Sequence, residues 1–257
     1  MEQRKWEELK VDCLVNVFRR LGMETLLLDI PFVCKSWYLA SKNPLCWESI
    51  IFPNLIPDIR NAAPFRDKLI DRYQLKDFST TAFIKFVIGR SQRCVTLLEL
   101  PSCCTEEALV FVANECPALR SLALPSALLL KQSALIPKLI CKWKNLEVLR
   151  LEGILDMSSI LPEISHHCNN FVELSAVGAF VGKGQASAIV TFLPNIKRLV
   201  LRKAAIEHDC LKTILEGCNE LVLLDVRDCI GFKETDEILN LAAHVEVFIS
   251  EGSRTRI

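Results

Sequence analysis

Hydrophobic positions recur along the C-terminal two thirds of the chain in groups with the pattern apolar-x-x-apolar-x-apolar. Complete groups begin at Leu119, Leu146, Phe171, Ile196 and Leu221, and weaker ones begin at Val95 and Val245. Successive groups start 24 to 27 residues apart, a period typical of solenoid proteins built from stacked units. The spacing predicts about seven structural repeats over residues 95–257.

The segments between these groups carry a second pattern, with apolar residues at i, i+3, i+4 and i+7. One example is Leu211, Ile214, Leu215 and Cys218. This spacing places the apolar side chains on one face of a short helix. Each repeat is therefore predicted to be a strand followed by a helix, and such a unit buries its apolar face only against its neighbours. We predict an α/β fold, a curved solenoid with parallel strands on the concave face and helices on the convex face.

Residues 1–50 do not fit the repeat and instead predict a compact module of three helices. Leu14, Val17 and Phe18 lie on one helical stripe, which Gly22 is expected to end. Pro31 is expected to begin the third helix. Residues 51–94 then join this module to the repeats and cap the N-terminal end of the solenoid, where Ser79 is placed to cap a helix.

The charge balance and the positions of the cysteines bear on nucleic-acid binding and on the cellular compartment of the protein. The 257 residues carry 31 basic and 31 acidic side chains, so the balance gives no support for a nucleic-acid binder. Most of the twelve cysteines lie inside apolar periodic runs, and no signal peptide opens the chain. We therefore expect reduced thiols in the cytoplasm or the nucleus. No apolar run reaches the ~18 residues that a membrane span needs.

Two clusters suggest cofactor chemistry, but each has a simpler interpretation. Residues 166–168 (His-His-Cys) and 103–104 (Cys-Cys) lack the ligand spacing of a zinc site, and Cys168 and Cys103 fall on repeat core positions. The glycines of residues 178–184 lack the Gly-Lys-Ser/Thr ending of a phosphate loop and lie where a repeat turns. We expect no metal, no cofactor and no catalytic residues.

Four spaced elements of the N-terminal module resemble an F-box. They are Leu9, the Val-Phe-Arg-Arg-Leu of residues 17–21, the Val-Cys-Lys-Ser-Trp of residues 33–37, and Trp47. Lys10 stands where the family has proline. The repeats are similar to the cysteine-containing type of leucine-rich repeat, and the chain as a whole resembles plant F-box/leucine-rich-repeat proteins. That resemblance implies a non-catalytic substrate-recognition adaptor of a cullin-type ubiquitin ligase. Its F-box would dock on a Skp-type adaptor, and its repeats would hold a protein substrate.

The resemblance also implies which apolar residues contact the Skp-type adaptor. The candidates are Leu9, Leu14, Val17, Phe18, Pro31, Val33 and Trp37. Some of these residues must form the core of the module instead, and the sequence does not divide the two groups.

Strand alternation predicts the side chains on the concave face of the repeats. The charged positions among them are Arg150, Glu152, Glu173, Arg198, Arg202, Asp225 and Arg227. Arginine pairs bidentately with carboxylate or phosphate, so these residues are compatible with a site for an acidic or phosphorylated substrate. The simpler and favoured interpretation is a solvated charged face with internal ion pairs.

Two other functions are compatible with the pattern. The chain would be an intracellular leucine-rich-repeat scaffold or inhibitor if its N-terminal helices merely cap the solenoid. A small-molecule co-receptor is less favoured, because about seven repeats form a shallow arc rather than an enclosed pocket.

Overall fold

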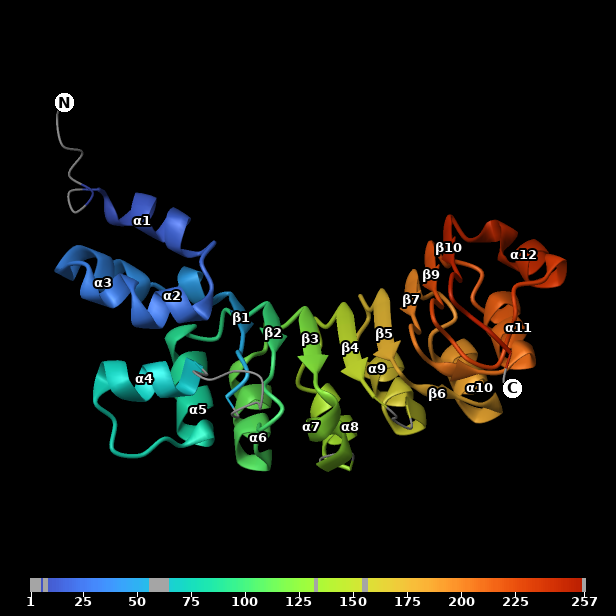
Figure 1. The fold of residues 1–257 in the computed structure, drawn as a ribbon, viewed down its shortest axis with the longest axis horizontal. Coiled ribbons are helices and arrows are strands. Elements are labelled where there is room, and N and C mark those ends of the chain that lie inside the picture. Colours follow the sequence, from blue (N-terminus) through green and yellow to red (C-terminus); the bar gives the residue numbers. More distant parts are fainter. Residues whose placement is uncertain (1–5, 7–8, 56–64, 132–133, 154–156, 256–257) are drawn as a thin grey trace. The chain divides into compact units, whose positions relative to one another are not determined.

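The computed structural model describes residue 6 and residues 9–55, 65–131, 134–153 and 157–255. The chain divides into two compact units, residues 1–119 and 120–257, which are described separately (Figure 1). The predicted boundaries at residues 50 and 94 remain predictions.

Short helices form the N-terminal part of the first unit. They are α1 (Val11–Phe18), α2 (Met23–Leu28), the 3-10 helix η2 (Ile30–Phe32), α3 (Lys35–Ser41) and the 3-10 helix η3 (Pro44–Trp47). Helices α1 and α3 pack together, and the ring of Phe18 meets the edge of Trp37 with 5.2 Å between ring centroids. Trp47 is fully buried, and its indole N–H donates to the carbonyl oxygen of Ser41 at 2.8 Å. The predicted three-helix module is thus present.

Its helix ends differ from the expected ones. Helix α1 ends at Phe18, and Gly22 instead precedes α2 as its N-cap. Pro31 lies in the short turn η2, whereas α3 begins only at Lys35. A proline fixes φ near the helical value, which suits a tight 3-10 turn as well as the first turn of an α-helix.

The rest of the first unit continues from this module. It comprises β1 (Ser49–Ile51), α4 (Phe65–Tyr73), α5 (Thr80–Arg90), β2 (Leu97–Glu99) and α6 (Glu106–Glu115). Helix α4 packs on α2, where Tyr73 donates its hydroxyl hydrogen to the carbonyl oxygen of Leu27 at 2.6 Å. The Ser79 hydroxyl accepts the Ala82 N–H at the start of α5, which confirms the predicted cap. Strands β1 and β2 pair in parallel, and β1 had not been predicted.

Parallel strands form the main sheet of the second unit. In sheet order they are β3 (Ser121–Leu124), β4 (Val148–Glu152), β5 (Glu173–Val177), β7 (Arg198–Val200), β9 (Leu223–Asp225) and β10 (Val247–Ile249). The short strands β6 (Phe180–Val181) and β8 (Ala205–Ile206) pair separately. The sheet order follows the chain order, as a stack of repeats requires.

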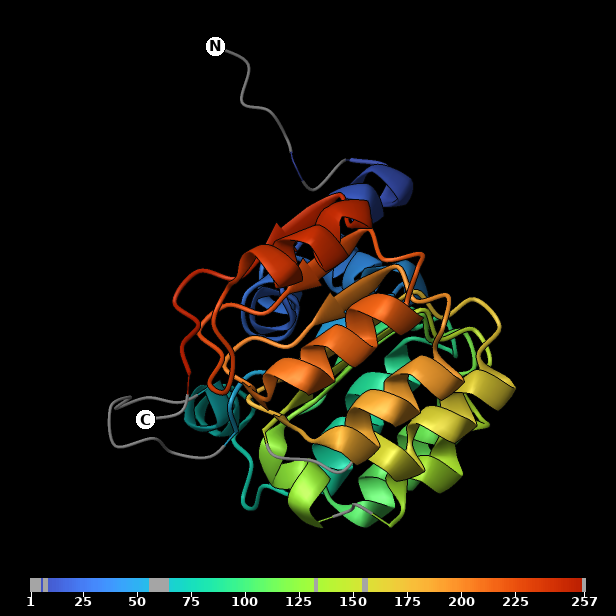
Figure 2. The same ribbon diagram turned by 90° about the vertical axis from the view of Figure 1, so that its right-hand side faces the viewer.

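Helices of the second unit lie together on one side of these strands (Figure 2). They are α7 (Ser126–Lys131), α8 (Ile136–Ile140), the 3-10 helix η4 (Met157–Ser159), α9 (Leu161–His167), α10 (Lys183–Phe192), α11 (His208–Gly217), α12 (Asp236–Leu241) and the 3-10 helix η5 (Ala242–His244). The repeat leucines lie between helices and strands, and Leu122, Leu149, Leu174, Leu199 and Leu224 are fully buried. The other face of this sheet carries the side chains that alternate with them.

The seven predicted groups match the observed strands at a constant offset. Each of the strands β2, β3, β4, β5, β7, β9 and β10 begins two residues after the first apolar position of its group. The strand-plus-helix repeat is therefore confirmed, and the fold is an α/β leucine-rich-repeat solenoid that follows an N-terminal helical module.

The repeat cysteines serve as packing residues between neighbouring repeats. The thiols of Cys168 and Cys229 donate to the carbonyl oxygens of Trp143 and Leu201, at 3.5 and 3.0 Å. Burial raises the pKa of each of these two thiols to about 11, which keeps them protonated and unreactive near neutral pH. Cys104 rather than the predicted Cys103 fills the interior position of its repeat.

Candidate interaction surfaces

Exposed apolar side chains concentrate on the N-terminal module. Among the described residues, nine of the twenty-one exposed large hydrophobic side chains lie between residues 6 and 45. The largest exposed fractions among residues 9–45 belong to Val33 (56%), Val17 (54%) and Leu39 (53%). A chain with a sizeable core has no need to leave so many apolar side chains in water, and such concentrations mark interaction sites.

The structure divides the seven candidate contact residues that the sequence had left together. Leu14 and Phe18 are buried and belong to the core of the module. Leu9, Val17 and Val33 are exposed, whereas Pro31 and Trp37 are half-buried.

Helix α1 shows the physical reason for this division. Leu14 and Phe18 are four residues apart and share its inner face, whereas Cys13 and Val17 are four residues apart on its outer face. Neighbouring apolar residues of one helix cannot all point inward.

Sequence reasoning missed several exposed apolar residues of the same module. They are Val11, Phe32, Leu39 and Leu45. Phe32 is the last residue of the turn η2, and Val33 follows it directly. Their side chains therefore point in different directions from the turn. An adjacent apolar pair beside a proline was the signal available for this part of the surface.

Lys10 occupies the N-cap position of α1, and its side chain makes no cap hydrogen bond. Lysine has no acceptor for the free N–H groups at a helix start. The carboxylate of Asp12, inside the first turn, favours that end electrostatically. The helix therefore begins normally without the proline of the F-box pattern.

The predicted charged positions of the repeats gather around two buried carboxylates. Glu173 on β5 is 6% exposed and lies opposite Arg198 on β7 in the strand register. The Nε of Arg198 is 3.0 Å from Oε2 of Glu173, and the Nε of Arg150 is 3.6 Å from Oε1. Two arginines from neighbouring repeats therefore share one carboxylate.

A second carboxylate, Asp225 on β9, repeats this arrangement. Arg227 binds it bidentately, with Nε 2.9 Å from Oδ1 and Nη2 2.6 Å from Oδ2, and the Arg227 backbone N–H also donates to Oδ1 at 3.2 Å. Arg202 stands farther away, with its Nε 3.9 Å from Oδ2. Burial alone would raise the pKa of Asp225, but the hydrogen bonds from Arg227 and the charges of Arg227 and Arg202 hold it below the usual range.

These seven residues keep a positive excess after pairing. Four arginines pair with the two buried carboxylates, and with the exposed Glu152 the seven residues carry four positive charges against three negative ones. The Nε of Arg202 is buried and has no hydrogen-bond partner among the described residues. Internal ion pairs are thus present, as the alternative interpretation expected, and they leave Arg202 as the least engaged cation.

Neither cofactor cluster of the sequence forms a ligand set in the described residues, where no group of three or more His, Cys, Asp and Glu side chains is placed to hold a metal ion. The glycine segment, residues 178–184, leads from β5 through the short strand β6 into the start of α10. Gly178 adopts a φ of 74° there, which favours glycine.

Within the described residues, no helix combines the length and the apolar character that a membrane crossing requires.

Comparison with known proteins relates most of the chain to one family, although no family model matches it. It is 30% identical over 226 residues to F-box/LRR-repeat protein At3g48880 of Arabidopsis thaliana, covering 87% of this chain and 72% of that protein. It is 26% identical to putative F-box/LRR-repeat protein 23 of the same plant, covering 89% of this chain but about half (49%) of that protein.

Among solved structures, this chain is similar to the leucine-rich-repeat ectodomain of the receptor kinase GASSHO1/SCHENGEN3 from Arabidopsis thaliana. The similar region covers 66% of this chain and 22% of the ectodomain chain. The overlap has 17% identity and a TM-score of 0.33. The identity to F-box/LRR-repeat protein At3g48880 extends over most of both chains and agrees with the helical module and the repeats described above. This chain therefore belongs to the F-box/LRR-repeat family.

Proposed function

We propose that the chain is the substrate-recognition adaptor of a cullin-type ubiquitin ligase. Its exposed apolar module docks on a Skp-type adaptor, and its repeats hold the protein to be ubiquitinated. The observation that carries this proposal is the concentration of exposed apolar side chains on the N-terminal module, at and around the positions that match the F-box pattern. Apolar anchors of this kind dominate stable interfaces.

Such an adaptor contributes position rather than chemistry. By binding a substrate and a ligase at once, it raises the effective concentration of a substrate lysine near the activated ubiquitin. Family membership supports this non-catalytic role. The raised pKa values of the buried cysteines support it as well, because thiols that stay protonated make poor nucleophiles.

The arginines around Glu173 and Asp225 are the proposed substrate site. Each buried carboxylate fixes the arginines beside it, so a bound acidic or phosphorylated segment meets guanidinium groups that are already oriented. The four guanidinium groups are the contacts that favour an anionic partner. We place this function in the cytoplasm or the nucleus, where the twelve cysteine thiols of the chain remain reduced.

Co-expression with a Skp-type adaptor tests the docking half of the proposal. The two proteins should co-purify in a one-to-one ratio, and co-expression should raise the yield of soluble chain. A chain that purifies as a stable monomer and ignores the adaptor would instead fit the scaffold interpretation.

Peptide titration tests the substrate half. The variant Arg202→Gln should bind an acidic or phosphorylated peptide about tenfold more weakly, the loss of one charge-assisted contact. The variant Lys212→Gln removes a cation from α11, outside the arginine cluster, and should bind as the wild type does. Equal effects of the two substitutions would contradict the assignment.

A further inference from the structure

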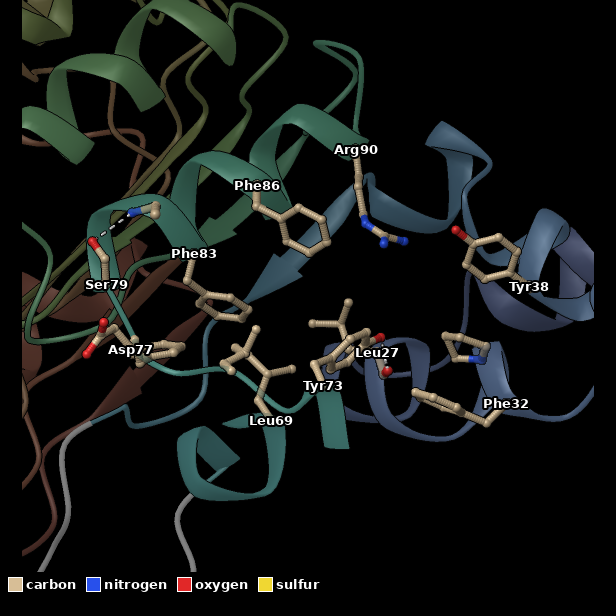
Figure 3. A pocket seen from close by; sticks show the side chains of 14 residues that line it. Leu27, Phe32, Tyr38, Leu69, Tyr73, Asp77, Ser79, Phe83, Phe86 and Arg90 are labelled. Atoms are coloured by element: carbon tan, nitrogen blue, oxygen red, sulfur yellow. Dashed lines mark hydrogen bonds between the residues drawn. The ribbon is translucent and has the colours of Figure 1, made fainter. Parts of the chain in front are cut away.

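The first unit contains a cavity of about 580 Å³, whose lining shares Pro31 and Phe32 with the proposed docking surface and otherwise lies outside both proposed surfaces. It lies among α3, η2, α4 and α5, and Figure 3 shows side chains from these elements turned toward it. Its described walls are largely aromatic, with contributions from Phe32, Tyr38, Tyr73, Phe78, Phe83 and Phe86. Small-molecule sites are typically apolar cavities of ~300–1,000 Å³ with a few polar groups, and this cavity falls within that range.

Arg90, the last residue of α5, is the cation among the described residues that line the cavity. Its guanidinium carbon lies 4.6 Å from the ring centroid of Phe86 and 5.2 Å from that of Trp47. Figure 3 shows the guanidinium turned toward the Tyr38 hydroxyl. The rings hold the charge in place without neutralising it.

This guanidinium is incompletely satisfied. Its Nη1 is buried and has no hydrogen-bond partner among the described residues, and none of their carboxylates forms an ion pair with Arg90. The charge of Arg90 is therefore left without an anionic partner, and a carboxylate in the cavity that Arg90 lines would supply one. Burial lowers the pKa of Arg90, but arginine stays charged in proteins at any physiological pH.

Apart from the Tyr38 hydroxyl, the other polar side chains that line the cavity are either engaged or distant from Arg90. The Tyr73 hydroxyl donates to the Leu27 carbonyl oxygen, and the Ser79 hydroxyl accepts the Ala82 N–H. Asp77 is exposed and lies at the opposite end of the cavity from Tyr38 (Figure 3). An anion bound at Arg90 is therefore kept away from the Asp77 carboxylate. The cavity has a positively charged end at Arg90, and the rest of its lining is mainly apolar.

We propose that this cavity binds an apolar monocarboxylic acid, with the carboxylate on Arg90 and the hydrocarbon body between the aromatic walls. A single guanidinium matches one carboxylate through two parallel hydrogen bonds, whereas a doubly charged phosphate would be left with unbalanced charge. The volume admits a small molecule rather than a folded segment of protein.

Calorimetric titration of the full chain near neutral pH tests this site with two matched pairs of probes. Decanoate and decanol share an aliphatic body, and 4-phenylbutyrate and 4-phenylbutanol share an aromatic one. Each acid should bind saturably and about tenfold more tightly than its alcohol. The pair that binds more tightly identifies the body that the cavity prefers.

Three variants connect this preference to the cavity. Arg90→Gln should abolish the preference for acid over alcohol. Arg93→Gln removes an exposed cation that pairs with Glu115 and should leave the preference unchanged. Ala82→Trp places a bulky side chain at an exposed position that lines the cavity and should abolish binding of all four probes without a loss of core packing.

Three results would each overturn the proposal. The first is the absence of saturable binding by either acid to a wild-type chain that melts cooperatively. The second is an acid preference that survives in Arg90→Gln, and the third is binding that survives in Ala82→Trp. None of these outcomes depends on the Skp-type adaptor, so the ligand site and the proposed function fail or succeed separately.

Discussion

Two substitutions in the N-terminal module should both reduce docking on a Skp-type adaptor, but for different reasons. Val33→Asp changes a side chain that is 56% exposed, and Phe18→Ala removes one that is 1% exposed. Val33→Asp should act on the interface alone, because the Val33 side chain contributes little to the core. Phe18→Ala should act on the fold, because the Phe18 ring packs against Trp37.

The magnitudes follow from these burials. Deleting a buried phenylalanine side chain costs about 3–5 kcal/mol of folding stability. Burying a whole valine side chain is worth about 1.5–3 kcal/mol, so the exposed half of Val33 contributes roughly 1 kcal/mol to docking, about fivefold in affinity. An aspartate at this position also brings an unpaired charge into the interface, which should raise the loss to at least about 3 kcal/mol, or more than a hundredfold.

Two assays on the same preparations separate the effects. Calorimetric titration with the Skp-type adaptor gives the affinity, and thermal unfolding of the free chain gives the stability. Val33→Asp should lose binding and keep the wild-type melting temperature, whereas Phe18→Ala should lower the melting temperature. Val222→Asp, the same substitution at an exposed residue of the second unit, is the matched control and should change neither.

Wild-type affinity in Val33→Asp would refute this reasoning. So would a drop in melting temperature as large as that of Phe18→Ala, because the side chain would then belong to the core and not to the docking surface.

Three further predictions concern the repeats. A Cβ on Gly217 would lie 2.2 Å from Cγ1 of Val190, so Gly217→Ala should destabilise the chain by about 1–3 kcal/mol. In denaturant titration, the double variant with Val190→Ala should regain most of this stability. Strictly additive effects of the two substitutions would contradict the contact. The indole N–H of Trp143 has no hydrogen-bond partner among the described residues. Trp143→Phe should therefore lower the free energy of unfolding much less than Trp143→Ala, which should lower it by roughly 3–5 kcal/mol. Equal losses of stability in denaturant titration would contradict this prediction. The pKa of Asp225 is lowered in the folded chain by its arginine contacts, which outweigh the effect of burial, so its contribution to stability is complete above the unfolded pKa of about 3.9 and disappears as the pH falls through the lower folded value. Melting temperatures measured across this acid range should fall less steeply in Asp225→Asn than in the wild type, and parallel curves would refute the assignment.

The repeat architecture could be predicted because its signal is periodic. Strand β9 begins two residues after Leu221, and its interior residue Leu224 is fully buried. The apolar positions of one repeat recur in the next, so a single interpretation was tested several times along the sequence. Strand β1 was missed because Ser49–Ile51 lies outside the repeat and is a strand only through its pairing with β2.

The sites were harder to predict, because they depend on tertiary packing. Val17 and Phe18 are adjacent and both apolar, yet one is exposed and the other buried, and only the packing of α1 against α3 decides which. The charged positions on the strands followed from alternation, but their sharing of Glu173 and Asp225 did not. The cavity at Arg90 joins side chains from Leu27 to Arg90 that share no sequence pattern.

Proximity labelling in cells, with and without proteasome inhibition, tests most directly whether this chain delivers proteins for degradation. Proteins labelled by the wild-type chain should accumulate when the proteasome is blocked. Proteins labelled by Val33→Asp, which keeps its repeats but loses the Skp-type adaptor, should be equally abundant with and without the inhibitor. A set of labelled proteins that is identical for both chains and indifferent to the inhibitor would contradict the adaptor role.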